Sequence, residues 1–138
     1  MKSLWQLYSE TVFLLEQPLG EQIDFAIITA YNPKGQACTL GFNRLQDKAL
    51  QADITNFRTP YRRLWGCSPQ LDYSEKSWAV SINKQQALTL ATKYQQNALY
   101  WVEQGELFLI PCMLTSHNEE NLGRFKSRCQ YQITDCCT

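Results

Sequence analysis

Seven consecutive residues without charge, at positions 25 to 31 (FAIITAY), constrain the fold of this chain more than any other stretch. Phenylalanine, isoleucine and threonine favour extended structure, and here apolar residues occupy both faces of the alternation. A strand of this kind belongs in the middle of a covered sheet. Residues 32 to 35 (NPKG) follow at once, and their asparagine, proline and glycine stand where a type I turn prefers them. The stretch therefore predicts a central strand that ends in a tight turn.

The segment after this turn has the spacing of an amphipathic helix. Thr39 can cap a helix that extends to about Phe57. The predicted core face consists of Phe42, Leu45, Ala49 and Ala52, widened by Leu50, Ile54 and Phe57. The positions expected to face solvent are Gln46, Asp47, Lys48 and Gln51.

A second helix has the clearest signal in the chain. Asn83 and Gln86 have the spacing of a capping box, so the helix is expected to begin at Asn83. Its predicted core face is Ala87, Leu90, Ala91 and Tyr94, which follow the i, i+3, i+4, i+7 pattern.

The remaining segments complete an α+β pattern. A short helix is expected over residues 2–9, and strands over 11–16, 61–68 and 76–82. Residues 98–112 are typical of a hairpin that turns at Gln104 and Gly105. The resulting strand-helix-strand-strand-helix-strand-strand core predicts a mixed or largely antiparallel sheet with two main helices packed on one face.

The apolar periodicity is lost after residue 112. We therefore expect a single domain over residues 1–112 and a C-terminal tail over residues 113–138. The tail either contains a short strand near residues 130–133 or docks loosely on the domain.

Composition excludes several classes of protein. Thirteen basic and thirteen acidic residues leave no net charge that would attract nucleic acid or an anionic membrane to the whole molecule. The N-terminal residues lack the unbroken apolar core of a signal peptide, and no run of about 18 apolar residues occurs. We therefore expect a cytoplasmic protein without a membrane partner.

The chain contains six cysteines and one histidine, the residue types that could bind a metal or act as nucleophile and base. In a cytoplasmic protein the cysteines are expected to stay reduced. The spacings along Cys112, His117, Cys129 and Cys136-Cys137 do not match paired zinc knuckles, so no metal site is predicted. Cys67 lies between Gly66 and Ser68 like a nucleophile on a tight turn, but its base would have to be His117, and a buried thiol is the preferred interpretation. No phosphate-binding glycine pattern is present, and we expect no cofactor.

Four stretches together resemble a known family: residues 25–35 (FAIITAYNPKG), 42–50 (FNRLQDKAL), 66–80 (GCSPQLDYSEKSWAV) and 96–107 (QNALYWVEQGEL). They are similar to the small bacterial proteins of the domain of unknown function family 3293, over about residues 5 to 112. The resemblance implies a compact bacterial domain and carries no reaction. Its pattern falls on Asn32, Pro33, Asn43, Gly66, Ser68, Pro69, Glu75, Ser77, Gln96 and Asn97.

This chain departs from the family pattern at Tyr73. Many members have a histidine two residues before the glutamate that corresponds to Glu75. A His-Glu catalytic or metal pair is therefore not general to the fold, or it has been lost here.

The candidate site consists of polar positions close to predicted element ends. These are Asn32, Asn43, Ser68, Glu75, Ser77, Gln96 and Asn97. Loops at one edge of a sheet commonly hold ligands, so the leading hypothesis is a module that binds a small polar molecule or a protein partner. The structural alternative is that these side chains cap helices and close turns.

Two alternative functions are compatible with the sequence. Glu75 lies among aromatic residues, where desolvation would raise its proton affinity, so an enzyme with Glu75 as general acid or base is the first alternative. Arg58, Arg62 and Arg63 alternate with Tyr61 and Trp65, which permits weak binding of single-stranded nucleic acid as the second. Because the net charge is balanced, nucleic acid is the less favoured partner.

Overall fold

The sheet of the computed structural model, which describes residues 1–131, has eight strands in the order β7-β6-β5-β2-β4-β3-β1-β8. Its strands are β1 (Val12–Leu15), β2 (Phe25–Ile28), β3 (Tyr61–Cys67), β4 (Ser74–Val80), β5 (Ala98–Glu103), β6 (Glu106–Pro111), β7 (Glu120–Arg124) and β8 (Cys129–Tyr131). Neighbouring strands are antiparallel except for β1 and β8, which are parallel. The four strands β5-β2-β4-β3 have the order of a split β-α-β arrangement. The α+β class and the mixed sheet are confirmed.

Strand β2 has the central position that its uncharged sequence predicts. All four residues are buried, and β2 pairs with β4 on one side and β5 on the other, with Ile27 opposite Ala79 and Tyr100. The turn after it is present, since the Gly35 N–H donates to the Asn32 carbonyl at 2.9 Å. The predicted turn type is wrong, however. Lys34 has a φ of 60°, because its N–H is held at 2.7 Å by the Gln95 carbonyl at the entrance to β5.

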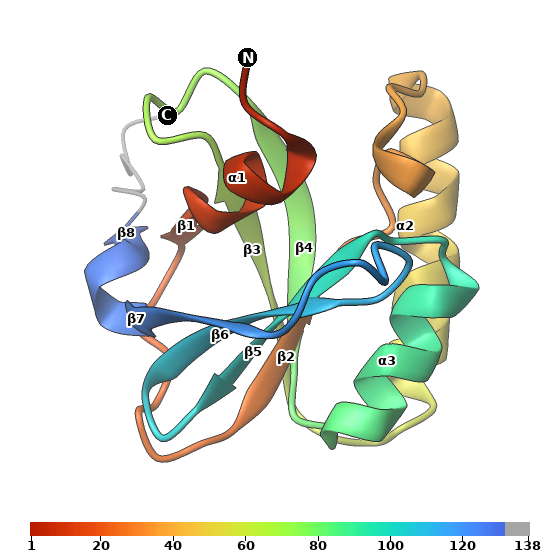
Figure 1. The fold of residues 1–138 in the computed structure, drawn as a ribbon. Helices are drawn as coiled ribbons and strands as arrows, with labels where there is room; N and C mark the ends of the chain where they lie inside the picture. Colours follow the sequence, from red (N-terminus) through yellow and green to blue (C-terminus); the bar gives the residue numbers. More distant parts are fainter. Residues whose placement is uncertain (132–138) are drawn as a thin grey trace, which may run out of the picture.

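Three α-helices accompany the sheet: α1 (Leu4–Ser9), α2 (Leu40–Thr55) and α3 (Lys84–Lys93). Two short 3-10 turns, η1 (Pro33–Gly35) and η2 (Phe125–Arg128), complete the elements. Helices α2 and α3 cover the same face of the sheet, as predicted (Figure 1). Helix α3 has the expected capping box between Asn83 and Gln86. Its predicted core residues, Ala87, Leu90, Ala91 and Tyr94, are all buried.

The predicted core face of α2 is correct at Leu50 and Ile54 but wrong at Phe42, Leu45, Ala49 and Ala52, which are exposed. Phe42 and Leu45 are exposed at 43% and 68%, while the buried residues are Asn43, Asp47, Leu50 and Ile54. Asp47, expected in solvent, accepts a hydrogen bond from the Trp78 indole N–H at 2.8 Å. It also forms an ion pair with Lys76 at 2.9 Å. We infer that polar contacts with the sheet set the rotation of α2 about its axis and thereby leave Phe42 and Leu45 exposed.

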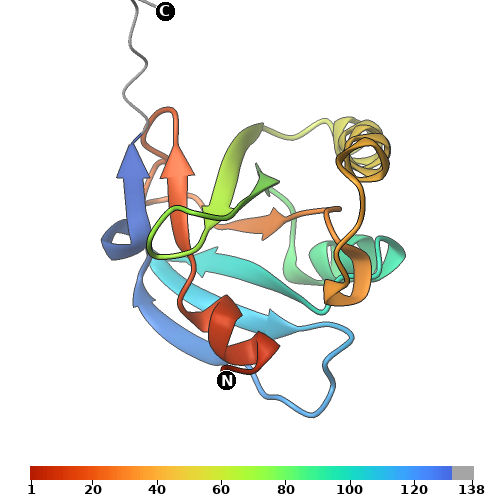
Figure 2. The same ribbon diagram turned by 90° about the horizontal axis from the view of Figure 1, so that it is seen from above.

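A second core fills the opposite, curled face of the sheet. It contains Phe13, Leu15, Phe25, Ile27, Leu64, Ala79, Val102, Leu107 and Phe125. Seen from above, the outer strands curl round this core and η2 connects β7 to β8 at the two edges of the sheet, while α1 lies over one end (Figure 2). The short strand expected near residues 130–133 appears as β8, and positions 132 and 133 lie outside the described residues. The division of the chain at residue 112 stays a prediction.

Candidate functional site

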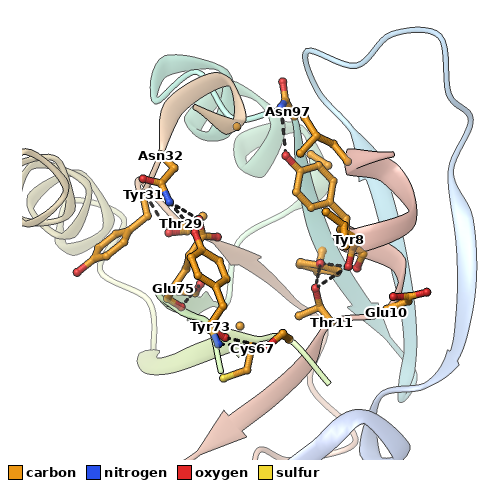
Figure 3. A pocket seen from close by; sticks show the side chains of 18 of the residues that line it. Tyr8, Glu10, Thr11, Thr29, Tyr31, Asn32, Cys67, Tyr73, Glu75 and Asn97 are labelled. Atoms are coloured by element: carbon orange, nitrogen blue, oxygen red, sulfur yellow. Dashed lines mark hydrogen bonds between the residues drawn. The ribbon is translucent and has the colours of Figure 1, made fainter. Parts of the chain in front are cut away.

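A cavity of about 430 Å³ lies at the end of the curled sheet, beneath α1. Its walls come from the ends of β2 and β3, the beginnings of β4 and β5, and the residues that join α1 to β1. Ligand sites in proteins commonly measure roughly 300–1,000 Å³. The cavity is therefore large enough for a small molecule, and it gathers segments that are far apart in the sequence (Figure 3).

Three side chains on one wall form a closed hydrogen-bonded group. The Tyr73 hydroxyl donates to Glu75 Oε1 at 2.9 Å. Asn32 Nδ2 donates to the same Glu75 oxygen at 3.0 Å and to the Tyr73 hydroxyl at 2.6 Å. The carboxylate is thus held in one orientation by two neutral donors (Figure 3).

Asn43 fixes Asn32 from behind the wall. Its Nδ2 donates to Asn32 Oδ1 and its Oδ1 accepts from the Asn32 backbone N–H, both at 2.9 Å. The Cys38 N–H donates to Asn32 Oδ1 at 3.0 Å. Asn32 itself is in the left-handed region, with φ 48° and ψ 63°. Because asparagine tolerates this region better than most residues, the local backbone and these contacts together aim its amide at Glu75.

Burial raises the pKa of the Glu75 carboxyl above its ordinary value of 4.5, and the hydrogen bonds from Tyr73 and Asn32 only partly oppose this change. Burial, reinforced by the neighbouring Glu75 charge, also raises the pKa of the Tyr73 hydroxyl. A carboxyl with a raised pKa in a cavity is a frequent feature of functional sites. Tyr73 remains protonated, so it acts toward Glu75 as a hydrogen-bond donor.

The wall opposite Glu75 is built around Tyr8 of α1. Asn97 Nδ2 donates to the Tyr8 hydroxyl at 3.1 Å. The Tyr100 hydroxyl lies within hydrogen-bonding distance of the Tyr8 carbonyl, at 2.6 Å, and of Thr11 Oγ1, at 2.8 Å. These contacts join α1 to the beginning of β5.

Gly35 allows α1 to approach this closely. A Cβ at position 35 would lie 2.9 Å from Asn97 Nδ2 and 3.0 Å from Leu4 Cδ1, and the φ of 73° is itself unfavourable for other residues. The glycine of the NPKG turn is therefore required by the site as well as by the turn.

The cavity wall carries acidic side chains but no basic ones. Of the residues that line it, Glu10 and Glu75 are the carboxylates, and no lysine, arginine or histidine is among them. Glu10 is neutralised by Lys2 at 2.7 Å. Lys76, adjacent to Glu75 in β4, points to the other face of the sheet because side chains alternate along a strand, and it pairs there with Asp47. Glu75 is thus the uncompensated charge of the lining.

Strained backbone is concentrated around the cavity. Among residues 1–131, six non-glycine residues have positive φ, and Asn32, Lys34, Leu71 and Gln95 are the four in the loops that surround it. Such conformations persist where surrounding contacts impose them, and they cluster at binding sites. Here each one turns a loop that carries residues of the wall.

The structure brings six of the seven predicted site residues to the cavity and places the seventh directly behind it. The lining includes Asn32, Ser68, Glu75, Ser77, Gln96 and Asn97, and Asn43 is buried in contact with Asn32. Some also have structural contacts, as the alternative hypothesis expected. Gln96 Nε2 donates to the carbonyls of Tyr31 and Tyr94, and Ser68 closes the β3–β4 loop through the Tyr73 N–H. Their role in binding stays a prediction.

The sequence did not indicate the hydroxyl-bearing part of the wall. It comprises Tyr8, Thr11, Thr29, Tyr31 and Tyr100. Tyr8 and Thr11 lie near the N-terminus and reach the cavity only because α1 folds over the end of the sheet. For the hydroxyl groups of the wall, the sequence offers one indication, which is Tyr73 at the position where the chain departs from the family pattern.

The cysteine hypotheses have no support in the described residues. Burial raises the pKa of the Cys67 thiol, and it raises that of Cys112 and Cys129 to about 12, which disfavours thiolate. His117 stacks on Trp5 with ring centroids 4.4 Å apart. Within residues 1–131, no group of three or more His, Cys, Asp or Glu side chains is placed to hold a metal ion. Cys136 and Cys137 lie outside these residues.

Two arginines are engaged in contacts within the protein, and one of them, Arg63, belongs to the segment predicted as the alternative nucleic-acid site. Arg63 pairs with Glu16 at 2.8 Å and lies over the Trp65 ring. Arg128 donates to the backbone carbonyls of Ser9 and Thr11. None of the helices within the described chain has the length and apolar character needed to cross a membrane.

A family model described as protein of unknown function (DUF3293) matches residues 28–99, from the end of β2 into β5. This range contains the Asn32, Tyr73 and Glu75 group together with Asn43 and Asn97. Neither the curated proteins nor the solved structures yielded a match to the chain.

Proposed function

Since the chain belongs to the DUF3293 family, for which no activity is defined, we propose from the geometry of the cavity that it is a binding protein for a small polar ligand. The observation that carries the proposal is the convergence of Asn32, Glu75 and Asn97, from three separate segments, on one hollow. A protein partner is less favoured because these groups line a recess beneath α1 and do not form a flat surface. The proposal retains the bacterial origin and cytoplasmic location expected from the sequence.

The polar contacts support this proposal because they keep the wall preorganised. Asn43 and Cys38 hold Asn32, and Asn32 and Tyr73 hold Glu75, so the carboxylate needs no rearrangement to meet a ligand. Preorganisation lowers the entropic cost of binding. A cluster that served only to close turns would not require a half-buried carboxylate without a cation.

A matched pair of alanine-to-tryptophan variants tests the proposal. Ala37 lies at the cavity, whereas Ala49 is exposed on α2 and outside the lining. A panel of small neutral, cationic and anionic polar compounds is screened by protein-observed NMR. We expect compounds that shift the signals of Asn32, Glu75 and Asn97 to bind the natural chain and Ala49→Trp equally, and Ala37→Trp at least about tenfold more weakly. If no compound in the panel binds, or if Ala37→Trp binds as well as Ala49→Trp, the proposal is wrong.

The raised pKa of Glu75 favours a second candidate, an enzyme in which Glu75 is a general acid or base. Tyr73 would orient the carboxyl, and the amides of Asn32 and Asn97 would orient the substrate. Each compound found to bind is followed for chemical change by mass spectrometry. Turnover that falls by about a hundredfold or more in Glu75→Gln supports the enzyme, and binding without any change in the bound compounds contradicts it.

A further inference from the structure

We propose that the ligand carries a protonated amine, which the Glu75 carboxylate binds in the space between the rings of Tyr8 and Tyr73. This inference rests on the proposed function, since it names the chemical class of the ligand in the same cavity. Three features of the wall carry it: its charges, the unused oxygen of Glu75, and the arrangement of its rings and apolar side chains.

The charges select against anions and in favour of cations. The lining contains no lysine, arginine or histidine, and Lys2 already occupies Glu10. The hydrogen bonds to Glu75 come from the neutral groups of Tyr73 and Asn32. A half-buried carboxylate is only partly solvated, so an opposite charge would stabilise it, and no basic side chain in residues 1–131 forms an ion pair with Glu75. A cationic ligand would supply the missing partner.

One oxygen of the carboxylate is left for that partner. Tyr73 and Asn32 both donate to Oε1, at 2.9 and 3.0 Å. Within the described part of the chain, no hydrogen bond or ion pair involves Oε2 of Glu75. An ammonium group has three donors, so it can bond Oε2 while also meeting neighbouring hydroxyl or carbonyl oxygens.

Aromatic rings flank the position of the cation. Tyr8 and Tyr73 stand on opposite walls, with Glu75 beside Tyr73 (Figure 3). The faces of such rings attract cations, and this holds at partly exposed rings such as those of Tyr8 and Tyr73. Leu4 and Leu7 of α1 add apolar surface on the Tyr8 side. A ligand whose ammonium group binds Glu75 would extend the rest of the molecule toward Leu4 and Leu7 of α1. An amine with an apolar remainder therefore fits both the Glu75 end and the α1 end of the cavity.

Three compounds that differ chiefly in one polar group test the inference: phenethylamine, phenethyl alcohol and phenylacetate. We expect calorimetric titration to show the amine binding at least about tenfold more tightly than the alcohol, and phenylacetate binding weakest. In Glu75→Gln the preference for the amine should disappear, while Glu21→Gln, an exposed carboxylate outside the cavity lining, should retain it. Tyr8→Leu provides an independent test, because loss of one ring should weaken the amine severalfold more than the alcohol.

The outcomes separate this inference from the proposed function. If the alcohol or phenylacetate binds the cavity as tightly as the amine, the inference is overturned and the small-ligand proposal stands. The inference is also overturned if neutral or anionic compounds from the wider panel bind the cavity and no amine does. Should Glu75→Gln not fold, the Tyr8→Leu comparison decides, and an unchanged preference for the amine there counts against the inference. If no compound of any class binds, the proposed function fails together with the inference.

Discussion

Helices α2 and α3 pack on the same face of the same sheet, but they do so with different chemistry. The buried residues within α3 are Ala87, Leu90 and Ala91, so the face that it packs on the sheet is apolar. The buried face of α2 begins with Asn43 and Asp47 and becomes apolar only at Leu50 and Ile54. Phe42 and Leu45 of α2 are left exposed.

This difference indicates distinct roles for the two helices. Helix α3 is oriented by the hydrophobic effect, which favours burial of its one apolar face. Helix α2 is oriented by directional contacts: Asn43 bonds Asn32 at the cavity wall, and Asp47 bonds Trp78 and Lys76 of β4. A buried polar group without a partner is costly, so these contacts outweigh the area that Phe42 and Leu45 would bury. We infer that α2 serves as a support for the site.

Truncation in the apolar helix should have the largest effect on stability. Leu90→Ala removes a buried side chain and leaves a void, so we expect the free energy of unfolding to fall by about 2–5 kcal/mol. Chemical denaturation measures this change. Binding of a cavity ligand should be little affected in the folded fraction, since Leu90 does not line the cavity. A loss of affinity as large as that of an Asn43 variant would remove the distinction between the helices.

Truncation in the polar helix should cost less stability but disturb the site. Asn43→Ala leaves the Asn32 N–H without a partner and removes one of the two donors to Asn32 Oδ1, so we expect a loss of about 1–3 kcal/mol. We also expect the NMR signals of Asn32, Tyr73 and Glu75 to shift, which Leu90→Ala should not cause. Lys48→Ala, on the exposed side of α2, is the control and should change neither quantity. Unperturbed signals in Asn43→Ala would show that α2 does not support the site.

Glu75 should make stability depend on pH. Because burial raises its folded-state pKa above 4.5, the folded protein holds the proton to higher pH than the unfolded chain. The free energy of unfolding should therefore fall as pH rises from about 4.5 through the folded-state pKa. The expected loss is about 1.4 kcal/mol for each pH unit that separates the folded-state pKa from the unfolded-state pKa.

Glu75→Gln removes this dependence, so the variant should be the more stable protein at neutral pH. Urea denaturation of both proteins across this pH range measures the difference. Glu16 and Asp53 have lowered pKa values, so they make the free energy of unfolding rise with pH in the acidic range. Both proteins contain these residues, so their contribution cancels when the free energy of one protein is subtracted from that of the other. Parallel curves for the two proteins would mean that the Glu75 carboxyl is not destabilised by burial.

The smallest effect is expected on the exposed apolar face of α2. Leu45 is exposed at 68%, so Leu45→Ala should change the free energy of unfolding by no more than about 0.5 kcal/mol. This change can be compared directly with that of Leu90→Ala, because both helices then carry the same leucine-to-alanine substitution. A loss above about 1.5 kcal/mol, beyond what an exposed site explains, would show that Leu45 is covered in solution.

The local elements could be predicted because local interactions determine them. The central strand, the capping box of α3 and the hairpin at Gln104 and Gly105 depend on neighbours within a few residues, and all three are present. The rotation of α2 could not be predicted in this way. Hydrophobic spacing ranks Phe42 above Asn43, and only the presence of Asn32 and Trp78 opposite the helix reverses that order.

The candidate site could be predicted only in part, because some of its residues have a local signal in the sequence and others do not. Polar residues at strand and helix ends, such as Asn32 and Glu75, stand out in the sequence, and the sheet topology brings them together. Tyr8 carries no such signal. It is more than 60 residues from Tyr73 in the chain and joins the wall because α1 crosses the end of the sheet.

The α+β class, the order of the core elements and the polar character of their ends can all be read from the amino-acid sequence, since they follow from periodicity and turn chemistry over short distances. The folded arrangement was needed to show which polar ends meet, which face α2 buries, and that Glu75 lies in a cavity without a cation. Those features depend on contacts between residues distant in the chain. Their energies arise from burial and partner geometry, neither of which exists before the chain folds.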